Sequence, residues 1–470
     1  MLFNSYEFIF FFLPIVILGY FLLGKKGTGL LSKVCLLLAS LFFYSYWNPI
    51  YLPLLLSSIL FNYCVSGIII NNRTGIKTIL SSKLAFRLGI CINIILLCFF
   101  KYMDFFIDNI NVVIGSHFSL LHIVLPLGIS FFTITQMVYL VDTYEGLVRE
   151  RNIVDYSLFV TFFPHLLAGP ILHHKPIMAQ FANVLITKIN YENIYRGLIL
   201  FVIGLFKKVI FADSLAPYVK IGFSNPEQLT FLNGWLTILG YGFQLYFDFS
   251  GYSDMAVGIA LIFNINIPIN FNSPFKATNI IDFWKRWHIS LTNVITTYLY
   301  TPILKSFSTI TFNKAMFATF MAMLLAGLWH GANWTFIIFG AMHGFGMVVN
   351  HIWKKRKLKM KTSLARCLTM LWVFMAWVFF RADNVTEAII ILKTMFGFND
   401  IWTIKNWAAD YRYLLKLCIV CGLVVYLVPN SNELIKKIEP NWKWVLVIGC
   451  MLALGILSLN NASEFLYFQF

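Results

Sequence analysis

Residues 324–346 read LLAGLWHGANWTFIIFGAMHGFG, an apolar run of helical length that carries a histidine in its middle. His330 lies between Trp329 and Trp334, and Asn333 follows three residues later, which is the spacing of one helix face. Ionisable side chains are costly in lipid, so those kept inside apolar runs are candidates for function. A histidine that only bonds a neighbouring helix is the alternative. We treat His330 as a candidate catalytic residue, with Trp329 and Asn333 as candidate substrate contacts.

The composition places the whole chain in a bilayer. Of the 470 residues, 59% are hydrophobic and only 12% are charged, whereas soluble domains carry about 25% charged residues. The net charge of +16 is explained by basic loops between membrane helices and requires no nucleic-acid partner. All eight cysteines lie in or beside apolar runs, where burial in the membrane is a better explanation than metal binding. We therefore expect a membrane protein without a metal site.

The apolar runs predict an all-α polytopic membrane protein. A helix needs roughly 20 apolar residues to cross a bilayer, and some runs are short or polar enough to be re-entrant or interfacial. We predict about 12 transmembrane helices in a single membrane domain over residues 1–470. The runs are centred on 6–24, 30–47, 51–70, 84–103, 123–140, 194–211, 229–247, 253–267, 315–329, 333–350, 364–380, 413–429 and 443–459.

The distribution of basic residues predicts the orientation of the chain. Lys25 and Lys26 follow the first run, and residues 353–366 read WKKRKLKMKTSLAR, the most basic stretch. Cytoplasmic loops carry the excess of Lys and Arg. Alternation then places both the N-terminus and the C-terminal tail, residues 460–470, on the extracytoplasmic side.

A second histidine lies in residues 279–303, NIIDFWKRWHISLTNVITTYLYTPI. His288 is preceded by Trp287 and followed two residues later by Ser290. The tryptophans and basic residues of this segment also suit a membrane-interface anchor. That alternative explains His288 and Ser290 less well, so His288 is a second candidate catalytic residue and Trp287 and Ser290 are candidate substrate contacts.

A third polar group interrupts residues 240–263, GYGFQLYFDFSGYSDMAVGIALIF. Asp248, Ser250, Ser253 and Asp254 stand there between apolar flanks. Aspartates in such a run are expensive unless they are paired or line a wet cavity. Both alternatives stay open, and we take Asp248 and Ser250 as candidate substrate-binding residues.

The chemistry available to this chain is that of imidazole. A histidine titrates near neutral pH and can act as a general base. A catalytic zinc site would need about three protein ligands, which the spacing does not offer. The sequence contains no H-E-x-x-H, G-x-S-x-G, Walker or G-x-G-x-x-G motif, so the hydrolase, kinase and dehydrogenase classes lack their usual support.

At FWKRWHISL (283–291) and GLWHGANW (327–334) the sequence resembles the membrane-bound O-acyltransferase family. Further blocks place it near the bacterial alginate O-acetyltransferase-like branch and extend the resemblance over nearly the whole chain. These blocks are MLFNSYEFIFFFLP (1–14), LPLGISFFTITQMVYLVDTYEG (125–146), FFPHLLAGPI (162–171), GLFKKVIFADSLAP (204–217), QLYFDFSGYSDMA (244–256) and VFFRADNVTEAI (378–389).

The resemblance implies a ring of helices around a central tunnel in a bacterial cytoplasmic (inner) membrane. It assigns the essential histidine of the family to His330 and the second polar position to His288. Relatives commonly carry an Arg-Asp pair before YLY, where this chain has Thr296 and Thr297. Any contact that the family makes through that pair is therefore in doubt here.

The C-terminal tail ends in FLYFQF, which fits the F-x-Y-x-x-F pattern found in this branch and in the helper peptide of teichoic-acid D-alanylation. The resemblance implies that Tyr467 carries an acyl group, with Phe465 and Phe470 as apolar anchors. An interfacial aromatic belt and a protease-site scar from expression are the alternatives. The scar alternative is disfavoured, because the second residue of the usual site and Phe470 do not fit it.

The resemblance also implies the reaction. Acetyl-coenzyme A would serve as the donor substrate, with no bound cofactor, and the acceptor would be an envelope glycan such as peptidoglycan or an alginate-like exopolysaccharide. An extracytoplasmic serine-esterase-like (SGNH) acetyltransferase is the implied partner. The alternatives are a teichoic-acid D-alanyltransferase, a long-chain acyltransferase of lipid or protein, and a non-enzymatic envelope lipid or glycan transporter.

Overall fold

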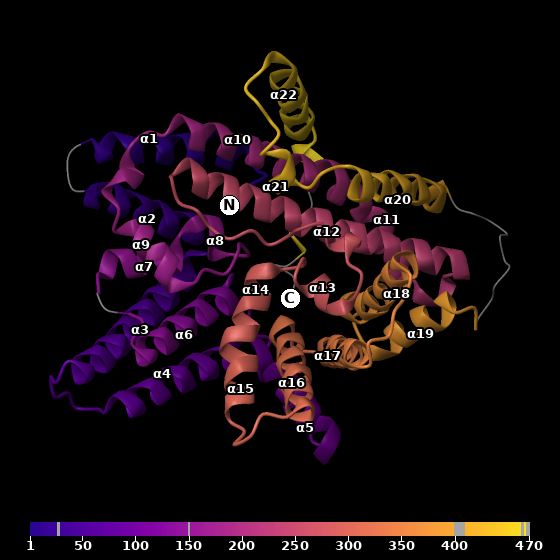
Figure 1. Cartoon of the computed structure of the whole chain (residues 1–470), viewed down its shortest axis with the longest axis horizontal. Helices are drawn as coiled ribbons and strands as arrows, with labels where there is room; N and C mark the ends of the chain where they lie inside the picture. The colour runs from indigo at the N-terminus through magenta and orange to yellow at the C-terminus, as the bar shows by residue number, and fades with distance from the viewer. Residues whose placement is uncertain (26–28, 149–150, 399–408, 462–464, 467–470) are drawn as a thin grey trace. The chain divides into compact units, whose positions relative to one another are not determined.

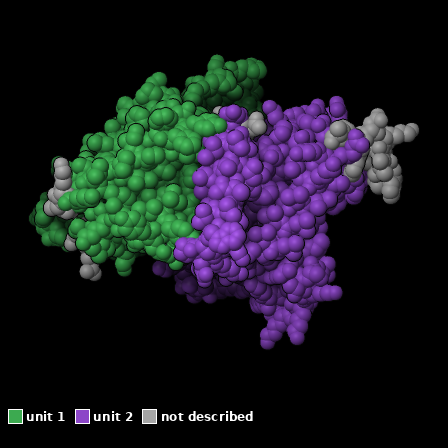
Figure 2. Space-filling view, turned by 90° about the horizontal axis from the view of Figure 1, so that it is seen from above, with its two compact units in different colours: residues 1–201, 255–268 green, residues 202–254, 269–470 purple. Residues whose placement is uncertain are grey.

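The computed structural model describes residues 1–25, 29–148, 151–398, 409–461, 465 and 466. Within those residues the chain forms helices and connecting loops and no strand (Figure 1), so the all-α prediction is confirmed. The chain divides into two compact units, shown in green and purple in Figure 2. Unit 1 holds residues 1–201 and 255–268, and unit 2 holds residues 202–254 and 269–470. The single membrane domain over residues 1–470 stays a prediction.

Unit 1 is built around the packing of α3, α4 and α6. Its apolar core there contains Val65, Ile69, Ala85 and Leu140. The helices of this unit are η1 (Glu7–Phe12), α1 (Leu13–Gly24), α2 (Leu30–Ser45), η2 (Pro49–Tyr51), α3 (Leu52–Arg73), α4 (Ser82–Leu97), η3 (Cys98–Tyr102), α5 (Met103–Ile114), α6 (Ile129–Glu145), α7 (Ile153–Thr161), α8 (Phe163–Leu166), α9 (His174–Phe181) and η4 (Val184–Thr187).

Two helices, α10 (Tyr191–Phe206) and α12 (Phe231–Ile262), contribute residues to both units. Unit 2 contains every candidate site residue from the sequence that lies within the described part of the chain. Its other helices are η5 (Lys207–Ala212), α11 (Asp213–Ser224), η6 (Pro226–Gln228), η7 (Pro274–Lys276), α13 (Ile280–Trp284), α14 (Ile289–Ile295), η8 (Thr296–Tyr300), α15 (Thr301–Lys305), α16 (Phe312–His330), α17 (Trp334–Lys355), α18 (Thr362–Arg381), α19 (Val385–Met395), α20 (Ala409–Leu427), α21 (Ser431–Leu434), α22 (Trp442–Leu457) and η9 (Leu459–Asn461).

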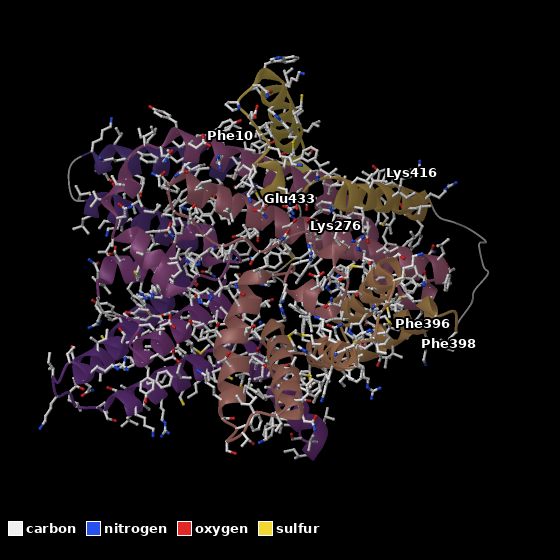
Figure 3. All side chains as sticks on the ribbon, viewed as in Figure 1. Phe10, Lys276, Phe396, Phe398, Lys416 and Glu433 are labelled. Atoms are coloured by element: carbon white, nitrogen blue, oxygen red, sulfur yellow. The ribbon has the colours of Figure 1, made fainter. Side chains whose placement is uncertain are left out.

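Six helical segments of the described chain are long and apolar enough to cross a membrane. Large apolar side chains lie on the outside of both units, as Phe10, Phe396 and Phe398 show in Figure 3 (50%, 51% and 78% exposed). Such side chains suit contact with lipid. The chain is a multi-pass membrane protein. The six segments are Glu7–Gly24, Pro49–Arg73, Ser82–Ile114, Phe312–His330, Trp334–Lys355 and Thr362–Arg381, and the shorter apolar helices are Leu30–Ser45 and Trp442–Leu457.

Glycines set the close crossing of α16 and α17. A Cβ on Gly327 would lie 2.4 Å from the Phe336 carbonyl oxygen and 2.6 Å from the Gly340 Cα. Small residues allow membrane helices to approach backbone to backbone. The short break after His330 then returns the chain alongside itself. The close crossing therefore follows from glycines of the 324–346 stretch.

One predicted boundary is wrong. The runs 229–247 and 253–267 appear separate in hydropathy, yet α12 continues without a break from Phe231 to Ile262. Asp248, between the runs, and Asp254, at the start of the second run, are paired with Lys208 and Lys207. Because both carboxylates are paired, the helix can continue through them.

Candidate active site

The turn between α16 and α17 places His330 at a helix end and inside unit 2. His330 is the last residue of α16 and is only 5% exposed. Asn333 caps α17: its Oδ1 accepts a hydrogen bond from the Thr335 backbone N–H (3.0 Å), and its Nδ2 donates to the Asp383 carbonyl oxygen (2.8 Å). Asn333 therefore holds the turn that presents His330. Its contact with substrate stays a prediction.

Aromatic rings surround His330. Its imidazole packs edge-to-face against Trp329, Phe339 and Phe380, with ring centroids 5.1, 5.9 and 5.2 Å away. These contacts restrict the orientation of the imidazole. The predicted role of Trp329 as a substrate contact stays a prediction, but its ring forms part of the wall around this histidine.

His288 occupies a strained backbone position directly before α14. Its φ of 44° is left-handed, a conformation that non-glycine residues rarely adopt, and the residue is fully buried. Asn270 holds the next turn: its Oδ1 accepts from the Ser290 hydroxyl (2.6 Å) and backbone N–H (3.1 Å), and its carbonyl accepts from the Ile289 N–H (3.0 Å). Strain of this kind persists where the surroundings over-determine it, often at functional sites. Ser290 therefore helps to orient His288.

A continuous aromatic cluster connects the two predicted histidines within unit 2. His330 packs on Phe339 (5.9 Å), and Phe339 packs on His343 (4.6 Å). His343 then stacks on Phe283 (6.2 Å), which stacks on Trp287 (5.7 Å), the residue just before the second histidine. Segments that are 40 residues or more apart in sequence thus meet in one apolar layer. Trp287 belongs to that layer, and its contact with substrate stays a prediction.

His343 is a candidate that the sequence reasoning missed. It is fully buried, and its Nδ1 accepts a hydrogen bond from the Trp284 indole N–H (3.2 Å). Because an indole N–H only donates, Nδ1 carries no proton and the hydrogen of the neutral ring lies on Nε2. The signal was available, since His343 lies in the same apolar run as His330. His343 adds a further buried imidazole to the aromatic cluster that contains His330.

Asp248 is paired with buried lysine. Its Oδ1 lies 2.6 Å from Lys208 Nζ, and the same ammonium lies 2.6 Å from Asp213 Oδ1. All three side chains are at most 3% exposed. The single ammonium of Lys208 thus offsets part of the negative charge of the two carboxylates, which is costly in low-dielectric surroundings. The structure favours the paired alternative for Asp248.

A second, partly buried pair follows on the same two segments. Lys207 Nζ lies 2.7 Å from Asp254 Oδ2, donates to the Ser431 hydroxyl (2.6 Å) and lies 3.5 Å from Ser250 Oγ. Ser250 therefore contacts a lysine, and its binding of substrate stays a prediction. Sequence reasoning missed Lys207 and Lys208, because no local spacing links them to aspartates some 40 residues later.

The described part of the C-terminal tail is buried in unit 2. Phe465 is 2% exposed and stacks on Tyr252 (4.6 Å between ring centroids, 23° between planes). Burying a phenylalanine side chain contributes about 1.5–3 kcal/mol. Phe465 is therefore placed to anchor the tail. Tyr467 and Phe470 lie outside the described residues, so their roles stay predictions.

The fold and the site together define a class of protein: a multi-pass helical membrane protein with buried histidines in an aromatic core. The chain belongs to the membrane-bound O-acyltransferase family, whose family model matches residues 78–386. It is an acyltransferase, and the predicted family is confirmed. Both predicted histidines lie within the matched region.

Relatives at high coverage are O-acetyltransferases. The chain is 41% identical to the peptidoglycan O-acetyltransferase of Helicobacter pylori, over the whole chain and 98% of the relative. It is 38% identical to the probable alginate O-acetylase AlgI of Azotobacter vinelandii, over 91% of the chain and 84% of the relative. A teichoic acid D-alanyltransferase of Streptococcus thermophilus is more distant, with 27% identity over 60% of the chain and 70% of the relative.

Proposed function

We propose that this chain transfers an acetyl group from acetyl-coenzyme A toward a glycan of the cell envelope, with peptidoglycan as the first acceptor class. The observation that carries the proposal is the 41% identity to a peptidoglycan O-acetyltransferase along both chains. An alginate-like exopolysaccharide is the second acceptor class, supported by the 38% identity to an alginate O-acetylase.

His330 acts as the general base in this proposal. The phenol of Tyr467 has an ordinary pKa of about 10, so its oxygen needs a base to attack at neutral pH. His330 takes the phenol proton as that oxygen attacks the thioester carbonyl. The carbon–sulfur bond breaks, coenzyme A leaves as a thiolate, and an acetyl ester remains on Tyr467. General-base assistance of this kind is typically worth about 10²–10⁴-fold.

The buried tail supports the covalent route. Phe465 packs on Phe249 (5.9 Å between ring centroids), and Phe249 packs on the imidazole of His288 (4.7 Å). The described tail therefore lies one aromatic ring away from a predicted catalytic residue. A tail at this place can bring a nucleophile to the site, as covalent catalysis requires.

The second half-reaction passes the acetyl group from Tyr467 to a hydroxyl on the extracytoplasmic side, and the phenol regains a proton. A serine-esterase-like (SGNH) envelope protein is the proposed partner that accepts the group and delivers it to the glycan. Acetyl-coenzyme A reaches the site from the cytoplasm, on the side of the basic residues 353–366. Both chain termini lie on the extracytoplasmic face of the cytoplasmic membrane.

D-Alanylation of teichoic acid is the other enzymatic candidate. It shares the family, but the D-alanyltransferase match covers only 60% of the chain. The terminal F-x-Y-x-x-F pattern is fused to this chain, whereas the D-alanylation system carries it on a separate peptide. Acetyl transfer is therefore favoured.

Reconstitution tests the proposed function. The purified full chain in lipid vesicles is incubated with radiolabelled acetyl-coenzyme A, an SGNH envelope protein as the proposed partner, and either peptidoglycan or alginate. Label is expected to enter peptidoglycan as base-labile ester. Two results would contradict the proposal. In one, acetyl-coenzyme A stays intact and no glycan is labelled. In the other, a parallel reaction with a labelled D-alanyl donor labels the acceptor, whereas labelled acetyl-coenzyme A does not.

His288→Ala is expected to lower turnover by about 10-fold or more, because a positioned imidazole next to the reacting groups contributes to transfer. Initial rates of acetyl transfer in vesicles measure the effect. Its matched control is His351→Ala, which removes a partly exposed histidine of α17. Near-normal turnover in His288→Ala would leave this residue with a structural role only.

A further inference from the structure

The backbone of the C-terminal tail is bonded to a buried carboxylate. The Leu466 backbone N–H donates a hydrogen bond to Asp248 Oδ2 (3.0 Å), across 218 residues of sequence. Asp248 is 1% exposed and Leu466 is 7% exposed. A hydrogen bond to a charged acceptor in such a place is stronger than one between neutral groups.

Lys208 prepares the carboxylate for this bond. Its ammonium pairs with Oδ1 of Asp248, whereas the tail uses Oδ2. The two oxygens therefore have different partners, and the ion pair fixes the direction in which Oδ2 points. Lys208 is itself held by Asp213. The ion pair thus orients the carboxylate through an oxygen that the tail does not use.

The acceptor and the aromatic slot lie on one helix. Asp248 and Tyr252 are four residues apart on α12, which places them on the same helix face. Tyr252 stacks on Phe465, while Phe249 contacts both Phe465 and His288. One turn of α12 therefore holds a tail side chain, the next tail N–H and a predicted catalytic imidazole.

We propose that Asp248, Phe249 and Tyr252 form a tail clamp, in which Asp248 is a positioning residue that fixes the register of the tail relative to His288. This inference rests on the proposed function for its catalytic consequence. Phe465 alone would anchor the tail by apolar burial, which allows sliding and rotation. The directed bond to the Leu466 N–H sets one register. Asp248 thus acts on the tail backbone, and its predicted contact with substrate stays a prediction.

Asp248 accepts a hydrogen bond from the backbone N–H of Leu466, so the clamp can be tested by removing that N–H without changing a charge. Leu466→Pro removes the donor, since proline has no N–H, and leaves every buried charge in place. Leu466→Ala shortens the side chain and keeps the donor, so it is the matched comparison. Asp248→Ala removes the acceptor, and Lys208 keeps Asp213 as its partner.

Carboxypeptidase trimming of the full chain in detergent, followed by mass spectrometry of the C-terminal peptide, measures release of the tail without reference to acetyl transfer. Leu466→Pro and Asp248→Ala are each expected to be trimmed about tenfold faster than Leu466→Ala, the order expected for loss of a hydrogen bond to a charged group. The double variant is expected to show no further increase, because both changes delete the same bond.

Acetyl transfer supplies the second readout. Release of the tail is expected to lower kcat in Leu466→Pro by a similar factor and to leave the KM for acetyl-coenzyme A unchanged. Equal trimming of Leu466→Pro and Leu466→Ala, or additive effects in the double variant, would overturn the clamp. If Asp248→Ala does not fold, the Leu466 pair alone decides the question. Faster trimming with unchanged kcat would keep the bond but overturn the role of Asp248 as a positioning residue.

Discussion

His330→Ala is expected to lower acetyl transfer by at least about 10²-fold, the usual contribution of a general base, while the chain stays folded. The ring is held by Trp329, Phe339 and Phe380 in an apolar pocket. Its removal leaves the phenol without a group to take its proton. Initial rates with labelled acetyl-coenzyme A, measured beside the melting temperature, separate loss of catalysis from loss of fold.

His351→Ala is the matched control for this variant, because it also deletes an imidazole from unit 2 but near the cytoplasmic end predicted for α17. It is expected to turn over at the wild-type rate. Two results would end the assignment of His330 as base: turnover within a few-fold of wild type, or a His330→Ala chain that fails to fold. His343, the buried histidine of unit 2 that packs on Phe339 in the same aromatic cluster, would then become the candidate base.

Tyr467→Phe is expected to reduce acetyl transfer by about 10³-fold or more, since it deletes the proposed nucleophile and residual rates without a nucleophile are small. The change keeps the ring and its apolar area and removes one oxygen. A tail that only anchors the chain would tolerate it. Mass spectrometry of the C-terminal peptide is expected to show an acetyl adduct in the wild-type chain when the partner is absent, and none in the variant.

Tyr413→Phe provides the comparison, because it removes a phenol oxygen from a half-exposed tyrosine on α20. Its rate is expected to match wild type. An active Tyr467→Phe chain without an adduct would show that the acetyl group takes another route. The clamp on Leu466 would still be measurable by trimming, so the two proposals fail separately.

Local sequence was sufficient for six of the long helices. The predicted runs 30–47, 51–70, 315–329, 333–350, 364–380 and 443–459 match α2, α3, α16, α17, α18 and α22 within about five residues at each end. The reason is that a bilayer rewards apolar length directly. The same logic failed at α12, where polar residues lowered the hydropathy although the helix continues. A hydropathy profile scores each residue by its type, so it does not show that Asp248 is paired with Lys208 from another helix.

The histidines show the same division. The sequence identified His330 and His288 because an imidazole within apolar surroundings is costly and therefore informative. It did not show that Asn270 bonds the turn after His288, or that His343 lies in the ring cluster between them. Those contacts join segments that are far apart in the chain. The free-energy cost of placing one polar residue in lipid says nothing about which residue it will contact.

By itself the sequence determined that the chain is helical and lies in a membrane, and it predicted His330 and His288 as catalytic residues, since these inferences follow from composition and the local cost of polar groups. The tertiary structure alone decided how Asp248 is used. Sequence left it between a structural pair and a cavity lining, and the fold gives one oxygen to Lys208 and the other to the Leu466 N–H. A carboxylate has two acceptors, and only the folded chain determines which donors reach them.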